Sequence, residues 1–417
     1  MKKTLLIISL FILVTTLNVF SQYYTESKTP QRIIINLTAT PATSMAVTWR
    51  TVDAIDNAVV EVAEATDWTE FKKNSKSIRP TSKNLVTDKD FTVYHHSAIM
   101  DQLKPNTTYV YRVGGDKVWS EWNQFKTAQD KDAPFRFVFL GDPQNEIKSD
   151  CSRIFRQAFK TAPDAAFWLI PGDLTSYPRD VEYDELFHAA GFIFGTTPSI
   201  FTADGHDNEY QVKDGEYVLT SSGSKRFSNT PSSLYREHFT LPENGLPEYK
   251  ETSYFVDYQG VRFIMINTYE DRKLDIQMPW LEETLSNNPY RWTVVSFHRP
   301  IYSAGDDRDN ERTRNAFLPV FDKYNVDLVL AGHDHAYSRS YKLKDGVKVS
   351  DDEKGTVYVV SVSGPKMYSV NTQYNDLMAK TGGYTQLYQV ISIKGQELLY
   401  ESFTATGGLY DSFKLQK

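Results

Sequence analysis

Five short apolar runs, each followed within a few residues by aspartate or histidine, constrain this chain more than any other feature of its sequence. The last run, residues 328–331, stops at Gly332 and leads into His333 and His335. A short run that lacks polar alternation and ends at a breaker is typical of a buried strand. In extended chain, side chains at positions i and i+2 project to the same side, and neutral imidazole is the commonest side-chain metal ligand. This run therefore predicts a strand that ends in a pair of candidate ligands.

The other four runs end in the same way. They are residues 135–140, which lead into Asp142 and Gln144; residues 166–170, which lead into Asp173; residues 199–203, which lead into Asp204, His206, Asp207 and Asn208; and residues 292–297, which lead into His298 and Arg299. One such loop has a plain structural explanation, because aspartate after a strand often caps a helix. Five of them together favour a metal site. Carboxylates and imidazoles suit two divalent or trivalent cations that share one bridging aspartate.

The order of strand-like and helical stretches predicts two domains. From residue 134 onward the two kinds of stretch alternate, which predicts an α/β domain over residues 134–417 with its reactive groups in loops after the strands. Residues 30–128 instead contain short β-branched and aromatic runs separated by Pro, Asn and Gly, which predicts a small all-β sandwich. The polar segment 127–133 marks the boundary. His95 and His96 in the first domain would face opposite sides of a strand, so we interpret that domain as a positioning module.

Composition restricts the partners and the cellular location. A net charge of −7 argues against nucleic acid as the main partner, because a phosphate-backbone binder needs a basic face, but it allows a small phosphorylated substrate. The single cysteine excludes an internal disulfide and a cysteine-built metal site. Residues 1–21 begin with Lys2 and Lys3 and continue as an apolar core, which predicts a signal peptide and an exported protein, whether periplasmic, on the cell surface or secreted. No other stretch predicts a stable membrane span. The oligomeric state is left open.

Taken in order, the motifs resemble those of a known family. The series Gly-Asp, Gly-Asp, Gly-His-Asp, Val-Ser-Phe-His and Gly-His-Asp-His, continued as Ala-Tyr-Ser-Arg to Arg339, resembles the purple-acid-phosphatase-like branch of the calcineurin-like metallophosphoesterases. Residues 45–51 and 103–109 resemble the fibronectin-type-III-like module that precedes the catalytic domain there. The resemblance covers nearly all of the mature chain. It implies a catalytic domain of two β-sheets flanked by helices, with the metals at one edge.

The resemblance also implies a role for each motif residue. The implied metal ligands are Asp142 and His335 on the first metal, His298 and His333 on the second, and Asp173 as the bridge. His206 would be the catalytic residue that contacts the phosphoryl group, and Arg299 would contact the substrate beside it. The two metal ions implied by the family are drawn from Fe, Zn and Mn.

Three positions depart from the family pattern and add candidate ligands. Gly205 stands where an asparagine would bind the second metal, so Asn208 or Asp204 would have to reach in from a reshaped loop. Tyr177 comes one residue later than the tyrosine that gives purple acid phosphatases their colour. Gln144 stands where the non-purple relatives have histidine, and its carbonyl oxygen could bind the first metal or orient a water.

Two functions remain open at this point. The favoured one is hydrolysis of phosphate monoesters or diesters by an exported enzyme with two metal ions, in which metal-activated hydroxide attacks phosphorus and His206 assists the leaving oxygen. The alternative is a metal-depleted surface or periplasmic protein that kept the fold, binds phosphate ligands and lost catalysis, and Gly205 motivates it. A count of bound metal ions distinguishes them, because the enzyme needs close to two per chain.

Overall fold

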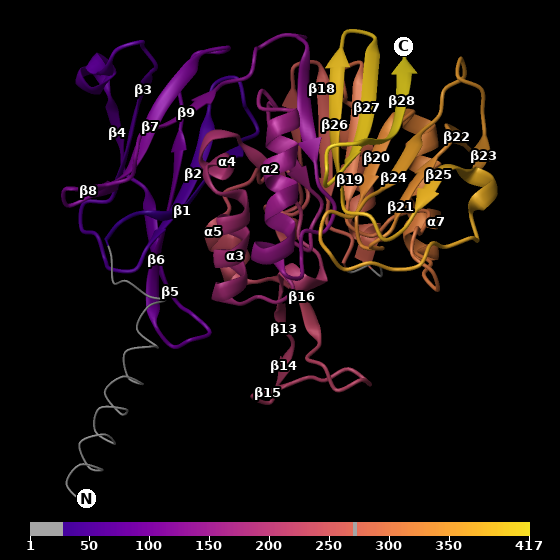
Figure 1. Ribbon diagram of the computed structural model, residues 1–417, viewed down its shortest axis with the longest axis horizontal. Helices are drawn as coiled ribbons and strands as arrows, with labels where there is room; N and C mark the ends of the chain where they lie inside the picture. The colour runs from indigo at the N-terminus through magenta and orange to yellow at the C-terminus, as the bar shows by residue number, and fades with distance from the viewer. Residues whose placement is uncertain (1–27, 270–272) are drawn as a thin grey trace, which may run out of the picture.

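The computed structural model describes residues 28–269 and 273–417 (Figure 1). The predicted signal peptide, residues 1–21, lies outside the described residues. Within the described ranges, no helix combines the length and the apolar character needed to cross a membrane. The N-terminal strands lie at one side of the molecule, most of the helices in its middle, and the C-terminal strands at the other side.

Residues 31–126 form the predicted β-sandwich. One layer contains β1 (Gln31–Leu37), β2 (Met45–Thr51), β5 (Thr81–Val86) and β6 (Thr92–Met100), and the other contains β3 (Val59–Glu64), β4 (Lys76–Ile78), β7 (Thr108–Gly115), β8 (Val118–Trp119) and β9 (Asn123–Lys126). Alternate side chains of each layer face the other layer, and Trp49 and Tyr111 are fully buried between them. The all-β class expected for this region is confirmed.

The first layer of this sandwich continues into the second predicted domain. Strand β1 pairs in parallel with β12 (Ser199–Phe201) at Asn36 and Ser199, and the Asn36 side-chain amide donates to the Ser199 carbonyl over 2.9 Å. The result is a mixed ten-stranded sheet with the order β28-β27-β26-β10-β11-β12-β1-β2-β6-β5. The two predicted domains therefore share one sheet, which the sequence pattern did not indicate.

A second large sheet packs against the part of the first sheet that belongs to the second domain. Besides β12, that part contains β10 (Phe135–Phe139), β11 (Trp168–Ile170), β26 (Leu387–Lys394), β27 (Glu397–Thr404) and β28 (Leu409–Gln416). The second sheet contains β17 (Tyr254–Tyr258), β18 (Val261–Ile266), β19 (Trp292–Phe297), β20 (Leu328–Ala331), β24 (Val357–Val360), β21 (Tyr337–Ser340) and β25 (Met378–Gly382). The ring of Phe137 on β10 meets that of Phe263 on β18 edge to face at 5.2 Å. The expected architecture of two packed sheets is confirmed.

Helices cover the outer faces of both sheets. They are α2 (Ser152–Thr161), α3 (Asp180–Ala190), α4 (Phe192–Thr196) and α5 (Ser233–His238) beside the ten-stranded sheet, and α6 (Leu274–Ser286) and α7 (Glu311–Tyr324) on the seven-stranded one. Phe155 of α2 stacks on Trp168 of β11 at 5.5 Å, and Phe317 of α7 packs on Phe297 of β19 at 5.2 Å. Both faces of the central strands are thus covered, which explains why those strands are continuous apolar runs in the sequence.

Short hairpins complete the fold. Strands β13 (Asn208–Tyr210) and β16 (Phe227–Pro231) form the base of an arm that extends from the body of the molecule, and β14 (Val212–Lys213) and β15 (Glu216–Tyr217) form its tip (Figure 1). Strands β22 (Leu343–Lys344) and β23 (Val347–Lys348) form another hairpin near the C-terminal side. The arm begins directly after the loop that carries His206.

Candidate metal centre

The five predicted motifs meet at one edge of the two packed sheets. Strands β10, β11 and β12 run parallel in one sheet, and β19 and β20 run parallel in the other. The carboxyl ends of these strands therefore place their loops together. Several ligand candidates in the loops have left-handed backbone, with φ values of 23° at Asp142, 49° at Asp173, 74° at His333 and 49° at His335. Such strained backbone at non-glycine residues is concentrated at functional sites.

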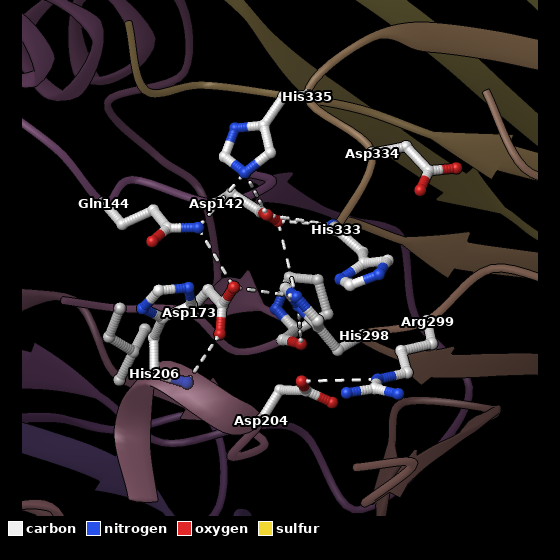
Figure 2. Close-up of polar contacts among 12 residues, drawn as sticks. Asp142, Gln144, Asp173, Asp204, His206, His298, Arg299, His333, Asp334 and His335 are labelled. Atoms are coloured by element: carbon white, nitrogen blue, oxygen red, sulfur yellow. Dashed lines mark hydrogen bonds and ion pairs between the residues drawn. The ribbon is translucent and has the colours of Figure 1, made fainter. Parts of the chain in front are cut away.

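Asp173, His298 and His333 form the tightest group. Each offers one ligand atom, and these atoms lie within 4.8 Å of one another. Asp173 Oδ2 is 3.0 Å from His298 Nε2 (Figure 2). The Asp173 and His298 side chains are buried, and that of His333 is partly exposed. One carboxylate and two imidazoles at this spacing are a ligand set that suits Zn, Mn or Fe.

Asp142 and His335 form a second group of candidate ligands, and Asp142 Oδ1 is also 3.8 Å from His298 Nδ1. His335 Nε2 is 3.5 Å from Asp142 Oδ2, and the backbone N–H of His333 donates to both oxygens of Asp142 over 2.8 and 2.9 Å. Gln144 lies between the two groups, with its Nε2 3.0 Å from Asp173 Oδ2 and 3.1 Å from His335 Nε2. Asp173 therefore contacts His298 directly and is linked to His335 through Gln144, which makes it the candidate for a ligand shared by two cations.

Backbone carbonyls orient the imidazoles. His298 Nδ1 donates to the Pro171 carbonyl over 3.1 Å, and His335 Nδ1 donates to the Lys366 carbonyl over 3.1 Å. These bonds fix the ring tautomers and leave each Nε2 available as a ligand atom, as is usual for histidines that bind metals. Asp207 holds the bridging loop in place, because its carboxylate accepts from the backbone N–H groups of Asp173 and Leu174 over 2.8 and 2.9 Å.

Burial and mutual charge determine the protonation of these side chains. Burial acts to raise the pKa of Asp173, but nearby histidines, chiefly His298, outweigh it and hold that pKa well below its usual range. Burial likewise acts to lower the pKa of His298, but Asp173 and Asp142 outweigh it and raise that pKa. Burial lowers the pKa of His333 well below its ordinary value and that of His335 to about 3. The last two histidines are therefore neutral, which is the form that binds metal.

His206 and Arg299 border the same site from the substrate side. His206 Nδ1 donates to the Ser176 carbonyl over 2.6 Å, and its backbone N–H donates to Asp173 Oδ1 over 3.2 Å. Arg299 Nε lies 3.6 Å from Asp204 Oδ1 (Figure 2), and its guanidinium stands 5.0 Å from the centre of the Tyr269 ring. These residues line a cavity of about 240 Å³ together with Gln144, Asp173, His333 and His335.

Sequence reasoning missed three residues that line this cavity. They are Lys366, Tyr269 and Arg308, and none of them belongs to the five strand-end motifs. Arg308 Nη1 donates to the His333 carbonyl over 3.1 Å, so the loop turns back onto the site. A signal for Lys366 existed, because it follows β24, the next parallel strand beyond β20.

Two further candidate ligands lie away from the cavity. The Asn208 side-chain amide donates to the Ser228 carbonyl over 3.0 Å, inside the base of the arm. The Tyr177 ring is 41 % exposed, and its centre is 6.5 Å from that of His206. The guanidinium of Arg179 stacks on the Tyr177 ring. We therefore retain Gln144 but neither Asn208 nor Tyr177 among the proposed ligands.

Comparison with known proteins agrees with this arrangement. Residues 30–127 match the N-terminal domain model of purple acid phosphatases, and residues 135–337 match the calcineurin-like phosphoesterase model. Purple acid phosphatase 23 of Arabidopsis thaliana is 26% identical over 395 residues, covering 84% of this chain and 82% of that protein. A purple acid phosphatase of Glycine max is 24% identical, covering 86% of this chain and 77% of its own length. A further relative that is 24% identical, from Arabidopsis thaliana, is named a probable inactive purple acid phosphatase.

Solved structures show the same fold. The purple acid phosphatase PPD1 of yellow lupin superposes with a TM-score of 0.76 at 19% identity, covering 93% of this chain and 74% of that one. The structure of PhoD superposes with a TM-score of 0.65 at 15% identity, covering 94% of this chain and 92% of that one. The family models span the sandwich and the strand ends that carry the cavity. The chain therefore belongs to the calcineurin-like phosphoesterases of the purple-acid-phosphatase type, whose members hydrolyse phosphate esters.

Proposed function

We propose that this chain is an exported phosphoesterase that works with two metal ions and acts on phosphate monoesters. One observation carries the proposal: side chains of metal-ligand type from both sheets converge on a single cavity of about 240 Å³, which His206 and three cationic side chains also line. A cavity of this size fits a phosphoryl group, so the rest of a small phosphorylated substrate would project outward.

The donor set fits two cations of the Fe, Zn or Mn type. His298 and His333 would hold one, Asp142 and His335 the other, and Asp173 both. Gln144 Oε1 is buried and has no hydrogen-bond partner among the described residues, as expected for an amide oxygen that completes the first of these sites. When bound, the two cations would lower the pKa of a bound water toward neutrality and would neutralise charge on the phosphoryl oxygens.

Three cations would bind the phosphoryl oxygens. Arg299, Arg308 and Lys366 come from three different loops and all line the cavity. Charge-assisted hydrogen bonds from such side chains to phosphate are about twice as strong as neutral ones. The chain as a whole is acidic, so this local group of cations explains how an anionic substrate is held.

His206 would transfer a proton to the leaving oxygen. Its Nδ1 donates to the Ser176 carbonyl, which fixes the ring and leaves Nε2 for proton exchange. Its backbone N–H donates to Asp173, so the position of the ring relative to the candidate ligands is fixed. General acid catalysis of this kind typically contributes about 10²–10⁴ in rate.

The test is turnover of model substrates by the purified mature chain loaded with Mn, Fe or Zn. We expect hydrolysis of p-nitrophenyl phosphate with at least one metal, and slower hydrolysis of bis(p-nitrophenyl) phosphate. No turnover of either ester with any of the three metals would refute the proposed enzymatic activity. Faster hydrolysis of the diester would refute the proposal that monoesters are the substrates.

The non-catalytic alternative predicts a different metal count. Gly205 motivates a protein that binds phosphate ligands with one metal ion or none. If the chain binds orthovanadate, a phosphate analogue, but holds fewer than two ions per chain and turns over nothing, this alternative replaces our proposal.

Export is tested separately, because the predicted signal peptide lies outside the described residues. We expect a mature protein that begins shortly after Ser21 when the full chain is expressed in a Gram-negative host. N-terminal sequencing of the periplasmic fraction checks this, and an intact Met1 in the cytoplasmic fraction would contradict it.

A further inference from the structure

The structure gives a physical reason for glycine at position 205. A Cβ built on Gly205 would lie only 2.6 Å from Tyr269 Cε2 and 3.1 Å from its Cδ2. Tyr269 has little freedom to move, because its hydroxyl donates to the Phe227 carbonyl over 3.2 Å and its backbone N–H donates to Asn267 Oδ1 over 3.1 Å. No larger side chain fits at position 205 while this ring stays in place, so an asparagine there is excluded.

The neighbouring residue, Asp204, has a carboxylate that the fold does not use fully. Its side chain is buried and lines the cavity. Oδ1 accepts from the Gly205 N–H over 2.7 Å, whereas Oδ2 has no hydrogen-bond partner among residues 28–269 and 273–417. A buried carboxylate oxygen without a partner is costly in free energy. A bound cation would remove that cost.

Asp204 lies close to the ring of His298, one of the two imidazoles proposed for the second cation. A Cβ built on Gly172 would lie 3.3 Å from Asp204 Cβ and 3.3 Å from His298 Nδ1, so the aspartate and the imidazole flank the same point. Figure 2 shows the Asp204 carboxylate near the His298 ring, with the Arg299 side chain beside it. Asp204 therefore lies beside His298 and lines the same cavity as Asp173 and His333.

We propose that Asp204 Oδ2 is a ligand of the cation held by His298 and His333, in place of the asparagine for which Tyr269 leaves no room. This inference rests on the proposed metal centre and adds a ligand to it. Compared with the family's asparagine, this ligand oxygen belongs to the residue one position earlier. It is a negatively charged carboxylate oxygen instead of a neutral amide oxygen. Arg299, whose Nε is 3.6 Å from Asp204 Oδ1, balances that charge.

A purely structural role for Asp204 is the competing explanation. Asp204 is the N-cap of the single helical turn Gly205–Asp207, and Asp207 Oδ2 accepts from its backbone N–H over 3.1 Å. Capping accounts for Oδ1 but not for Oδ2. Serine is an equally good N-cap, yet its side chain is too short to bring an oxygen to the cation.

The experiment compares two substitutions at Asp204 with a control in the same loop. Metal content is measured after equilibrium dialysis of each metal-stripped protein against Mn²⁺, and affinities are measured by titration calorimetry. We expect about two ions per chain in the unmodified protein and about one in Asp204→Ser. Asp204→Asn keeps an oxygen in place and should bind the second ion at least about 10-fold more weakly, a loss of the size seen when metal sites lose supporting groups. The control Asn208→Ala should still bind two ions.

The outcomes separate this inference from the proposed centre. If the unmodified protein binds two ions and Asp204→Ser also binds two, Asp204 is only a cap and the inference is wrong. If Asp204→Ser fails to fold, as judged by thermal unfolding of the metal-free proteins, Asp204→Asn decides, and an unchanged affinity for the second ion overturns the inference. Fewer than two ions in the unmodified protein would refute the two-metal centre itself, and loss of one ion in Asn208→Ala would assign the missing ligand to Asn208 instead.

Discussion

Three of the four imidazoles at the site are held by different backbone carbonyls: His298 by Pro171, His335 by Lys366 and His206 by Ser176. The first two rings lie against Asp173 and Asp142, whereas His206 approaches Asp173 with its backbone N–H. The same residue type therefore serves two purposes at one site. Single substitutions can separate them.

We expect His298→Ala, His333→Ala and His335→Ala each to lose bound metal together with activity, because each removes an imidazole from a cation with few protein ligands. His206→Ala should keep about two ions and lose about 10²–10⁴ in kcat. Metal analysis beside steady-state kinetics for the four variants checks this. Metal loss in His206→Ala would show that His206 is itself a ligand.

The colour of the iron-loaded protein is a second prediction for single residues. Ser176 stands at the position of the colour-giving tyrosine, and its hydroxyl accepts from the Asn145 N–H over 2.9 Å. Tyr177 is 41 % exposed and stacks with Arg179 away from the cavity. We therefore expect no intense visible absorption band when ferric iron is bound. A purple protein would mean that Tyr177 reaches the metal.

Residue types at strand ends could be predicted from the sequence, but side chains that depend on loop geometry could not. Asp142, Asp173 and His298 follow apolar strands directly, so their meeting at one sheet edge follows from the parallel order of those strands. Tyr269 reaches the cavity from the loop after β18, where no histidine or Gly-Asp motif marks it, and its effect on position 205 depends on a contact of 2.6 Å. Such distances cannot be predicted from the spacing of residues along the sequence.

At the scale of elements, helix α3 is fastened to the sandwich by a buried charge group. Asp180 at its first turn accepts from Arg32 of β1 and Arg50 of β2, with Oδ1 2.7 Å from each Nη1. All three side chains are nearly inaccessible to solvent. Since α3 follows the loop of Ser176 directly, the charge group also anchors the segment that orients His206.

We expect Asp180→Asn to lower the free energy of unfolding by about 3–5 kcal/mol, because two buried guanidinium groups lose the buried carboxylate that pairs with both. The matched control is Asp184→Asn, whose side chain is 63% exposed and 3.6 Å from Arg32. That change should cost about 0–1 kcal/mol. Urea unfolding of both variants gives the answer, and equal midpoints would show that the charge group contributes little.

Strand positions could be predicted where the apolar pattern was strong, whereas the pairing of strands with one another could not. The runs that predicted strands at residues 135–140, 292–297 and 328–331 correspond to β10, β19 and β20. The pairing of β1 with β12 rests on one residue pair between segments more than 150 positions apart. Nothing in either segment marks the other as its partner.

At the scale of the whole molecule, buried neutral histidines lie where the sandwich meets the catalytic region. His95 of β6 and His238 of α5 pack edge to face at 4.6 Å, and Arg32, Arg50 and Asp180 surround them. Burial, followed by the charge of Arg50, lowers the pKa of His95 to about 3. Burial also lowers the pKa of His238 well below its ordinary value. Both rings therefore stay neutral in the folded protein.

This arrangement predicts that the chain loses stability in acid. The unfolded chain protonates His95 below about pH 6.5 whereas the folded chain does not until about pH 3, so the unfolded state binds more protons in that window. The free energy of unfolding should fall by up to about 1.4 kcal/mol per pH unit for His95, or about 2 kcal/mol at pH 5. Urea unfolding of metal-free protein at pH 7 and pH 5 measures the slope, and His95→Gln should flatten it. Identical slopes would contradict the prediction.

The shared ten-stranded sheet has a consequence for how this protein can be divided. A fragment that begins at residue 134 would lose β1 and leave β12, a strand from the middle of the sheet, as an open parallel edge. Such an edge offers unpaired N–H and C=O groups to any other chain and promotes association. The fragment would also uncover the apolar and charged faces of α3 and α5. The sandwich thus covers this edge of the catalytic region, and we expect a fragment without it to self-associate.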